Sequence, residues 1–140
     1  MTKVIVVGVD GSETANRAAE TAARLATSLG ANLHVVTAFN NDRAQVLGIG
    51  NDERAFSEEK YAEKVAREAA AAVQSGRLQV SYFTIRGTPA QALIQQADAH
   101  SAHVIVVGSR RMSGLGRVLG SVANSVAHKA PCDVYIAKTE

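Results

Sequence analysis

Glycines and arginines gather in one segment of the chain, GSRRMSGLGRVLGSV, which runs from Gly108 to Val122. Glycines let backbone N–H groups approach phosphate oxygens closely. A helix that begins at the Gly-Ser pair near the end of the segment adds unpaired N–H donors and a partial positive charge. The segment therefore predicts a phosphate-binding site, and the alternative is a flexible surface loop before an ordinary helix. The candidate ligand residues are Gly108, Ser109, Arg110, Arg111, Met112, Gly114, Gly120, Ser121 and Val122.

The charge around this segment supports an anion site. No acidic residue lies between Asp98 and Asp133, and the basic residues there are Arg110, Arg111, Arg117 and Lys129. Such a distribution creates a local field that attracts an anion, although it can also arise by chance. The net charge of the whole chain is only +2, which is too small to indicate nucleic acid as a partner.

A second candidate site is the turn Val9-Asp10-Gly11-Ser12. The Asp10 carboxylate and the Ser12 hydroxyl suit ribose hydroxyls or the amino groups of a base. Alternatively, both side chains only cap the helix that follows. The two interpretations do not exclude each other.

Several enzyme classes are excluded by missing motifs. The chain has no GxxxxGK(S/T) phosphate loop, and Leu119 occupies the position where the dinucleotide spacing would need a glycine after Gly116. It has no GxSxG nucleophile motif. His100 and His103 have a metal-like spacing but flank a turn from helix to strand and are interpreted as ordinary surface or capping histidines, and the single Cys132 is interpreted as a small apolar filler. We therefore predict no catalytic residue and no metal site.

The elements that position these residues alternate between strands and helices. Strands are predicted at 3–9, 32–38, 78–86, 103–107 and 132–138, and helices at 13–29, 58–75, 90–100 and 120–129, with Thr88 and Pro89 opening the third. Alternation of this kind indicates an α/β fold with a parallel sheet and helices on both faces. We find no internal boundary and expect one domain over residues 1–140.

The compartment follows from what the sequence lacks. No apolar run approaches the roughly 20 residues that a membrane span needs. The N-terminus enters a strand pattern without the three regions of a signal peptide. One cysteine cannot form a disulfide framework. We expect a cytoplasmic protein with no membrane contact.

The sequence resembles the universal stress protein family. The resemblance is carried by the opening VIVVGVDGSETANRAAETAARLA, the turn IRGTPAQALIQQA, and the segment HVIVVGSRRMSGLGRVLGSVANSVAHKAPCDVYIAK. It implies a Rossmann-like, open five-stranded parallel sheet in the order 3-2-1-4-5. It also implies nucleotide binding in members that carry the pattern G-2x-G-9x-G-S/T.

The pattern is matched incompletely here. Gly108 matches its first glycine and Gly120-Ser121 its end, but Arg111 takes the place of the middle glycine and the loop is one residue shorter. The Cβ of Arg111 is a penalty of roughly 1 kcal/mol if φ must be positive there. Arg111 can instead add a charge-assisted bond to phosphate. The resemblance further implies that Val9 and Asp10 contact base or ribose, and that the backbone of Ala38 reads adenine.

The resemblance implies a stress-response regulatory protein that binds an adenine nucleotide of the ATP or AMP type, with magnesium accompanying ATP. The alternatives are a cyclic AMP-binding protein and an interaction module that binds no nucleotide. A true ATPase is the weakest alternative, since no base to position water can be named, and any hydrolysis should be slow. The polar segment 39–57 is expected to be a mobile loop near the adenine.

The last predicted strand, CDVYIAK, begins at Cys132 and ends at Lys138. In the implied order it lies at one edge of the sheet. It has charges only near its ends and no internal proline, so it is poorly protected as a free edge. We expect it to pair with its copy in a second chain and form a twofold homodimer, as family members do. The alternative is a monomer whose edge strand is short.

Overall fold

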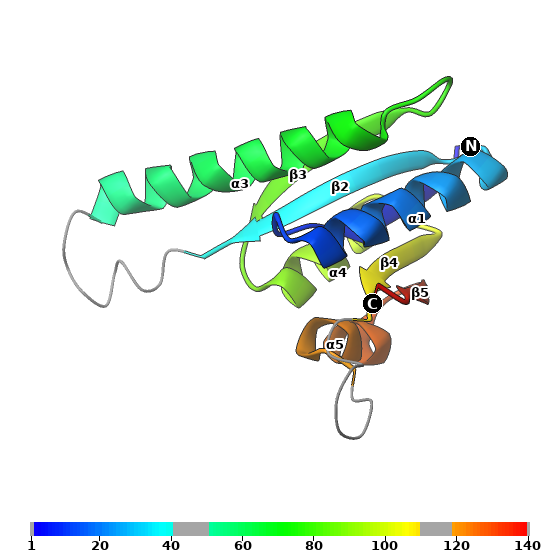
Figure 1. Cartoon of the computed structure of the whole chain (residues 1–140). Coiled ribbons are helices and arrows are strands. Elements are labelled where there is room, and N and C mark those ends of the chain that lie inside the picture. Colours follow the sequence, from blue (N-terminus) through cyan, green and yellow to red (C-terminus); the bar gives the residue numbers. More distant parts are fainter. Residues whose placement is uncertain (1, 41–50, 110–118, 140) are drawn as a thin grey trace.

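The computed structural model describes residues 2–40, 51–109 and 119–139. Its strands form one parallel sheet in the order β3-β2-β1-β4-β5, with helices on both faces (Figure 1). The predicted fold class and strand order are thus confirmed. The elements are β1 (Val4–Gly8), α1 (Glu13–Leu29), β2 (Asn32–Phe39), α3 (Asn51–Val73), β3 (Val80–Arg86), α4 (Pro89–Ala99), β4 (Val104–Gly108), α5 (Ser121–Lys129) and β5 (Asp133–Ala137).

Two apolar clusters, one on each face of the sheet, form the core. On one face α1 and α3 pack on odd-numbered residues of β1 and β2, such as Ile5 and Val35. On the other face α4 and α5 pack on even-numbered residues of β1 and β2, such as Val6 and Val36. This alternation follows from the period of two along a strand. It explains why the central strands are apolar on both faces, as strands covered on both sides must be.

Local sequence explains how two helices are placed. The buried stripe of α1 consists of small residues, which let the helix lie close to the sheet, and the helix ends at Gly30 in the left-handed conformation (φ 64°). In α4, Thr88 and Gln91 form a reciprocal capping box and Pro89 is the first helical residue. The predicted opening of α4 is therefore confirmed.

One boundary prediction is wrong. We expected a loop over 39–57 and a helix from Glu58, but α3 begins at Asn51. The sequence at this point, Asn-Asp-Glu, consists of residue types that favour a helix N-terminus. We interpreted the polar composition of this segment as a loop and so placed the helix start too late. The part of the predicted mobile loop from 41 to 50 lies outside the described residues.

The site region follows from the sheet topology. The chain runs outward from β1 through β2 to β3, and later from β4 to β5 on the other side, so β1 and β4 are neighbours at the point where strand order reverses. Both strands end in a glycine, Gly8 and Gly108. In open α/β sheets, ligands bind beyond the carboxyl ends of strands at this place.

Candidate functional site

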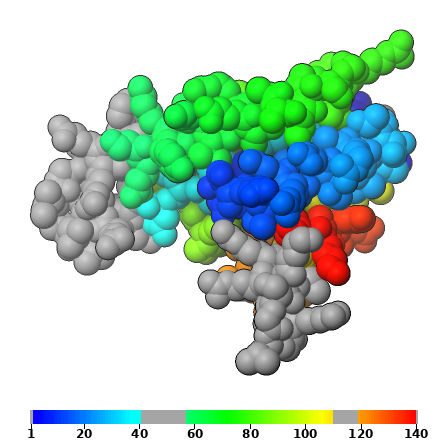
Figure 2. All heavy atoms as spheres, viewed as in Figure 1, coloured from blue at the N-terminus to red at the C-terminus, as the bar shows by residue number. Residues whose placement is uncertain are grey.

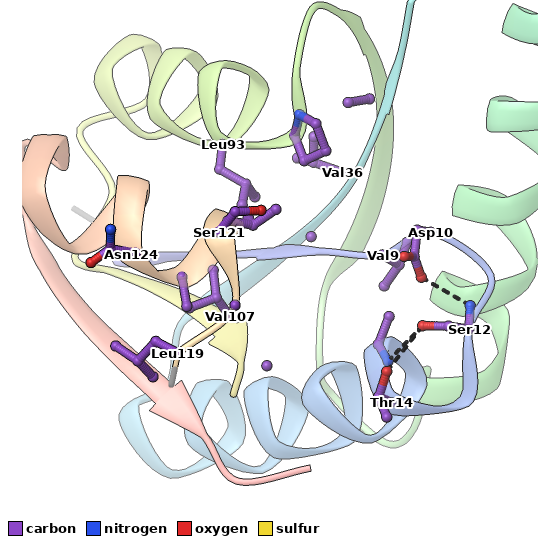
Figure 3. A pocket seen from close by; sticks show the side chains of 18 residues that line it. Val9, Asp10, Ser12, Thr14, Val36, Leu93, Val107, Leu119, Ser121 and Asn124 are labelled. Carbon is purple, nitrogen blue, oxygen red and sulfur yellow. Dashed lines mark hydrogen bonds between the residues drawn. The ribbon is translucent and has the colours of Figure 1, made fainter. Parts of the chain in front are cut away.

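A cavity of about 970 Å³ lies at the carboxyl ends of β1 and β4. Figure 3 shows it between the turn after β1 and the start of α5. The structure brings together residues from both segments that the sequence singled out. The predicted residues that line it are Val9, Asp10, Ser12, Ala38, Gly108, Gly120, Ser121 and Val122.

One end of the cavity is formed by the N-terminus of α5. Gly120 is the N-cap residue, and no side chain in the described part of the chain caps the helix there. The first helical bond runs from Asn124 N–H to the Gly120 carbonyl at 3.0 Å, so the amides of the first turn point to the cavity end without a side-chain partner. The first turn carries no acidic residue, and His128 and Lys129 lie in the last turn. This end is suited to an anion.

The other end of the cavity is the turn after β1. Gly11 has φ +88°, a conformation that favours glycine, and the Ser12 N–H donates to Asp10 Oδ1 at 2.9 Å. Ser12 Oγ accepts from the Ala15 N–H at 3.2 Å and lies 3.2 Å from Thr14 Oγ1. Ser12 therefore caps α1, as one interpretation of the sequence expected. Asp10 and Ser12 both line the cavity as well, so the cap that Ser12 forms does not exclude the predicted binding role of either residue.

The side walls come from residues that sequence reasoning missed. Val36 of β2, Leu93 of α4, Val107 of β4 and Leu119 before α5 supply apolar side chains, labelled in Figure 3. A Cβ on Gly8 would lie 3.1 Å from two Leu93 methyl carbons, so the missing side chain keeps space for α4. Val36 and Val107 could have been predicted from their positions, because both come near the carboxyl ends of parallel strands. Thr14 and Asn124, which lie within the first turn of their helices, were also missed.

Ser109, a predicted site residue, does not line this cavity. It is fully buried, its N–H donates to the Ala137 carbonyl at 2.7 Å, and its hydroxyl accepts from the Thr139 N–H at 3.2 Å. It connects the end of β4 to the segment after β5. Arg110, Arg111, Met112 and Gly114 lie outside the described residues, so their predicted roles stay predictions.

The remaining candidate groups are Cys132 and the side chains that could hold a metal ion. Cys132 is partly buried, and burial, followed by the nearby Asp133, raises the pKa of its thiol, which disfavours the reactive thiolate. In the described ranges no three His, Cys, Asp or Glu side chains are close enough to hold a metal ion. Over the same ranges, no helix has the length and apolar character to cross a membrane.

Comparison with known proteins identifies relatives over the whole length. The model of the universal stress protein family matches residues 1–138. A universal stress protein of Thermus aquaticus is 36% identical over 140 residues, which cover 99% of this chain and 100% of that protein. A universal stress protein of Mycobacterium tuberculosis is 33% identical over 142 residues, covering 98% of this chain and 97% of the relative.

Solved structures with the same fold include two with bound nucleotides. A universal stress protein in complex with cAMP superposes with a TM-score of 0.78 at 30% identity, covering 99% of this chain and 98% of the other. The universal stress protein of Archaeoglobus fulgidus in complex with dAMP gives a TM-score of 0.73 at 25% identity, with the same coverage.

Proposed function

Because the chain belongs to the universal stress protein family, we propose that it binds an adenine nucleotide of the ATP or AMP type and acts as a stress-response regulatory protein. The observation that carries the proposal is the cavity of about 970 Å³, which has uncapped helix amides at one end and hydroxyl and carboxylate groups at the other. Nucleotide binding in similar proteins, with cAMP in one and dAMP in another, supports the proposal.

The polarity of the cavity gives the proposed orientation of the ligand. The phosphates lie against Gly108 and the first turn of α5, where Gly120, Ser121 and Val122 supply amides and a hydroxyl. Ribose and base extend toward Val9, Asp10, Ser12 and Ala38, because the Asp10 carboxylate repels phosphate but accepts hydrogen bonds from hydroxyl and amino groups. Arg110 and Arg111 are proposed to supplement the phosphate end.

Magnesium fits only as a companion of ATP. Asp10 is the one carboxylate among the described residues lining the cavity, and no group of three potential ligands exists in the described ranges. A single carboxylate cannot replace the several oxygen ligands that Mg²⁺ needs. Magnesium would therefore be held by the phosphate oxygens of ATP and by water, and we propose no resident metal and at most slow hydrolysis.

A second candidate ligand is cyclic AMP. The cAMP-bound relative at 30% identity favours it, and a single cyclic phosphate needs fewer donors, which the shortened glycine loop can still supply. The third candidate is an interaction module that binds no nucleotide. Calorimetric titration with ATP, AMP and cyclic AMP, with and without magnesium, separates the three. Heat of binding from none of them would refute the proposed function.

The proposed assembly of the chain concerns the outer edge of β5. β5 is the terminal strand of the sheet and pairs on one side with β4. We propose that its outer edge pairs with the same strand of a second copy, forming a homodimer in the cytoplasm. Its exposed Tyr135 would then lie beside the dimer seam.

A further inference from the structure

A second, smaller cavity of about 430 Å³ lies beside the first. It is bounded by the end of β2 and by α3. It lies on the face of the sheet toward which the Thr37 side chain points, and the Ala38 side chain points to the opposite face. Asp10 and Ala38 line both cavities, so the two hollows meet at these residues. We call it the side pocket.

Two oxygen atoms on the lining residues of the side pocket are buried and have no hydrogen-bond partner in the described part of the chain, Thr37 Oγ1 and Glu58 Oε2. Thr37 as a whole is only 6% exposed. A buried oxygen without a partner costs about 1–3 kcal/mol, and more when it is charged. Such atoms in a folded protein call for an explanation. A bound ligand that donates hydrogen bonds to these two oxygens would explain them.

The same pocket has an exposed aromatic ring at its edge. Tyr61 follows Glu58 by one helical turn, lines the pocket, and is 64% exposed. Its hydroxyl lies over the turn after β1, where a Cβ on Gly11 would come within 3.7 Å of it. An exposed aromatic face beside polar acceptors suits a planar, nitrogen-containing ring.

The side pocket adjoins the base end of the proposed nucleotide. Figure 3 shows Ser121 and Asn124 at one end of the main cavity and Asp10 and Ser12 at the other. With the phosphates at α5, the base lies toward Asp10 and Ala38, where the side pocket begins. Asp10 and Glu58 are the only charged residues lining it in the described ranges, so it repels phosphate and favours a donor group.

We propose that Glu58 and Thr37 recognise the exocyclic amino group and the adjoining edge of the base, and so select an aminopurine. The Glu58 carboxylate accepts a hydrogen from the amino group. The Thr37 hydroxyl can donate to a neighbouring ring nitrogen, which gives both buried oxygens a partner. Tyr61 covers the ring. This inference rests on the proposed nucleotide function, and it adds side chains of β2 and α3 to the base contact expected of the Ala38 backbone.

The test compares AMP with purine riboside 5′-monophosphate, which differs from AMP only in lacking the 6-amino group. Wild-type protein should bind AMP roughly tenfold more tightly, the effect of one hydrogen bond to a charged group. Glu58→Gln should lower the ratio of the two dissociation constants about threefold, because a neutral amide oxygen is a weaker acceptor than a carboxylate. Glu59→Gln, a change at an exposed neighbour on the same helix, should leave the ratio unchanged.

Thr37→Val is a second, nearly isosteric variant that keeps the test valid if Glu58→Gln folds poorly. It should weaken both ligands several-fold while leaving their ratio above one, because it removes the partner of the ring nitrogen and not that of the amino group. Equal wild-type affinity for the two ligands would overturn the inference and leave nucleotide binding intact. Failure of both ligands to bind would overturn the proposed function and the inference with it.

Discussion

The side-chain amide nitrogen of Gln96 lies 3.0 Å from Nδ1 of His34, and this buried contact joins α4 to β2 on the face of the sheet that α4 covers. His34 is 8% exposed, and its ring centroid lies 4.8 Å from those of Phe83 and His100. An amide N–H can donate only to an unprotonated ring nitrogen, so the contact favours neutral His34. Burial, and to a lesser degree His100, lowers the pKa of His34 below its ordinary value of 6.5.

Stability should therefore decrease under mildly acidic conditions. Below the unfolded-state pKa of about 6.5, the unfolded chain binds a proton at His34 that the folded chain takes up less readily. This contribution is present in full above that pH and is lost as the pH falls toward the lowered pKa of the folded state. Urea unfolding at pH 7.5 and 5.5 should show the loss. His34→Asn should reduce the difference, and His103→Asn, at an exposed histidine, should not.

Gly120→Asp should abolish nucleotide binding while the fold survives. Aspartate is a good N-cap residue, and Gly120 has an ordinary φ of −62° with no side-chain cap to displace, so the melting temperature should stay the same or rise slightly. The new carboxylate would occupy the anion end of the cavity and repel phosphate. Calorimetry measures the affinity. An unchanged dissociation constant in a folded variant would show that the phosphates bind elsewhere.

Ile136→Pro should convert the proposed dimer to a monomer. The Ala137 carbonyl accepts from Ser109 N–H, so the backbone groups of Ala137 face β4 and, by alternation, those of Ile136 face the open edge. Proline removes an outward donor and spares the ladder to β4. Sedimentation at micromolar concentration should give a dimer mass for the wild type and for the control Ile136→Val. A wild-type monomer, or a dimer that survives the proline, would contradict strand pairing.

Thr88→Ala should destabilise the protein by about 1 kcal/mol, because it removes the hydroxyl that accepts from the Gln91 N–H at 3.2 Å and opens the capping box of α4. The free energy of unfolding in urea measures the effect. Thr2→Ala, at an exposed threonine outside the helices, is the matched control and should change stability by less than about 0.5 kcal/mol. A loss at Thr88 no larger than the control's would mean that the helix start is held by packing alone.

The candidate site could be predicted only in part, and the reasons differ from residue to residue. Gly120 and Ser121 follow a glycine-rich segment directly, and the helix that starts there is visible in the sequence, so both were found. Leu93 was not, because it lies in the middle of an apolar helix face and only packing across the sheet brings it to the cavity. Ser109 was predicted to belong to the site because its neighbours in the sequence do, but its hydroxyl accepts a hydrogen bond from the Thr139 N–H and lies away from the cavity.

Sequence patterns alone predicted the order of strands and helices, the glycines that end β1 and β4, and the family, because periodicity, turn residues and motifs are local properties. Tertiary structure decided which side chains from distant segments meet. Thr37 and Ala38 are adjacent in the chain, yet strand alternation directs them to opposite faces of the sheet, and only the placement of α3 encloses Thr37 with Glu58. A pocket formed by such contacts depends on long-range packing, which no local pattern records.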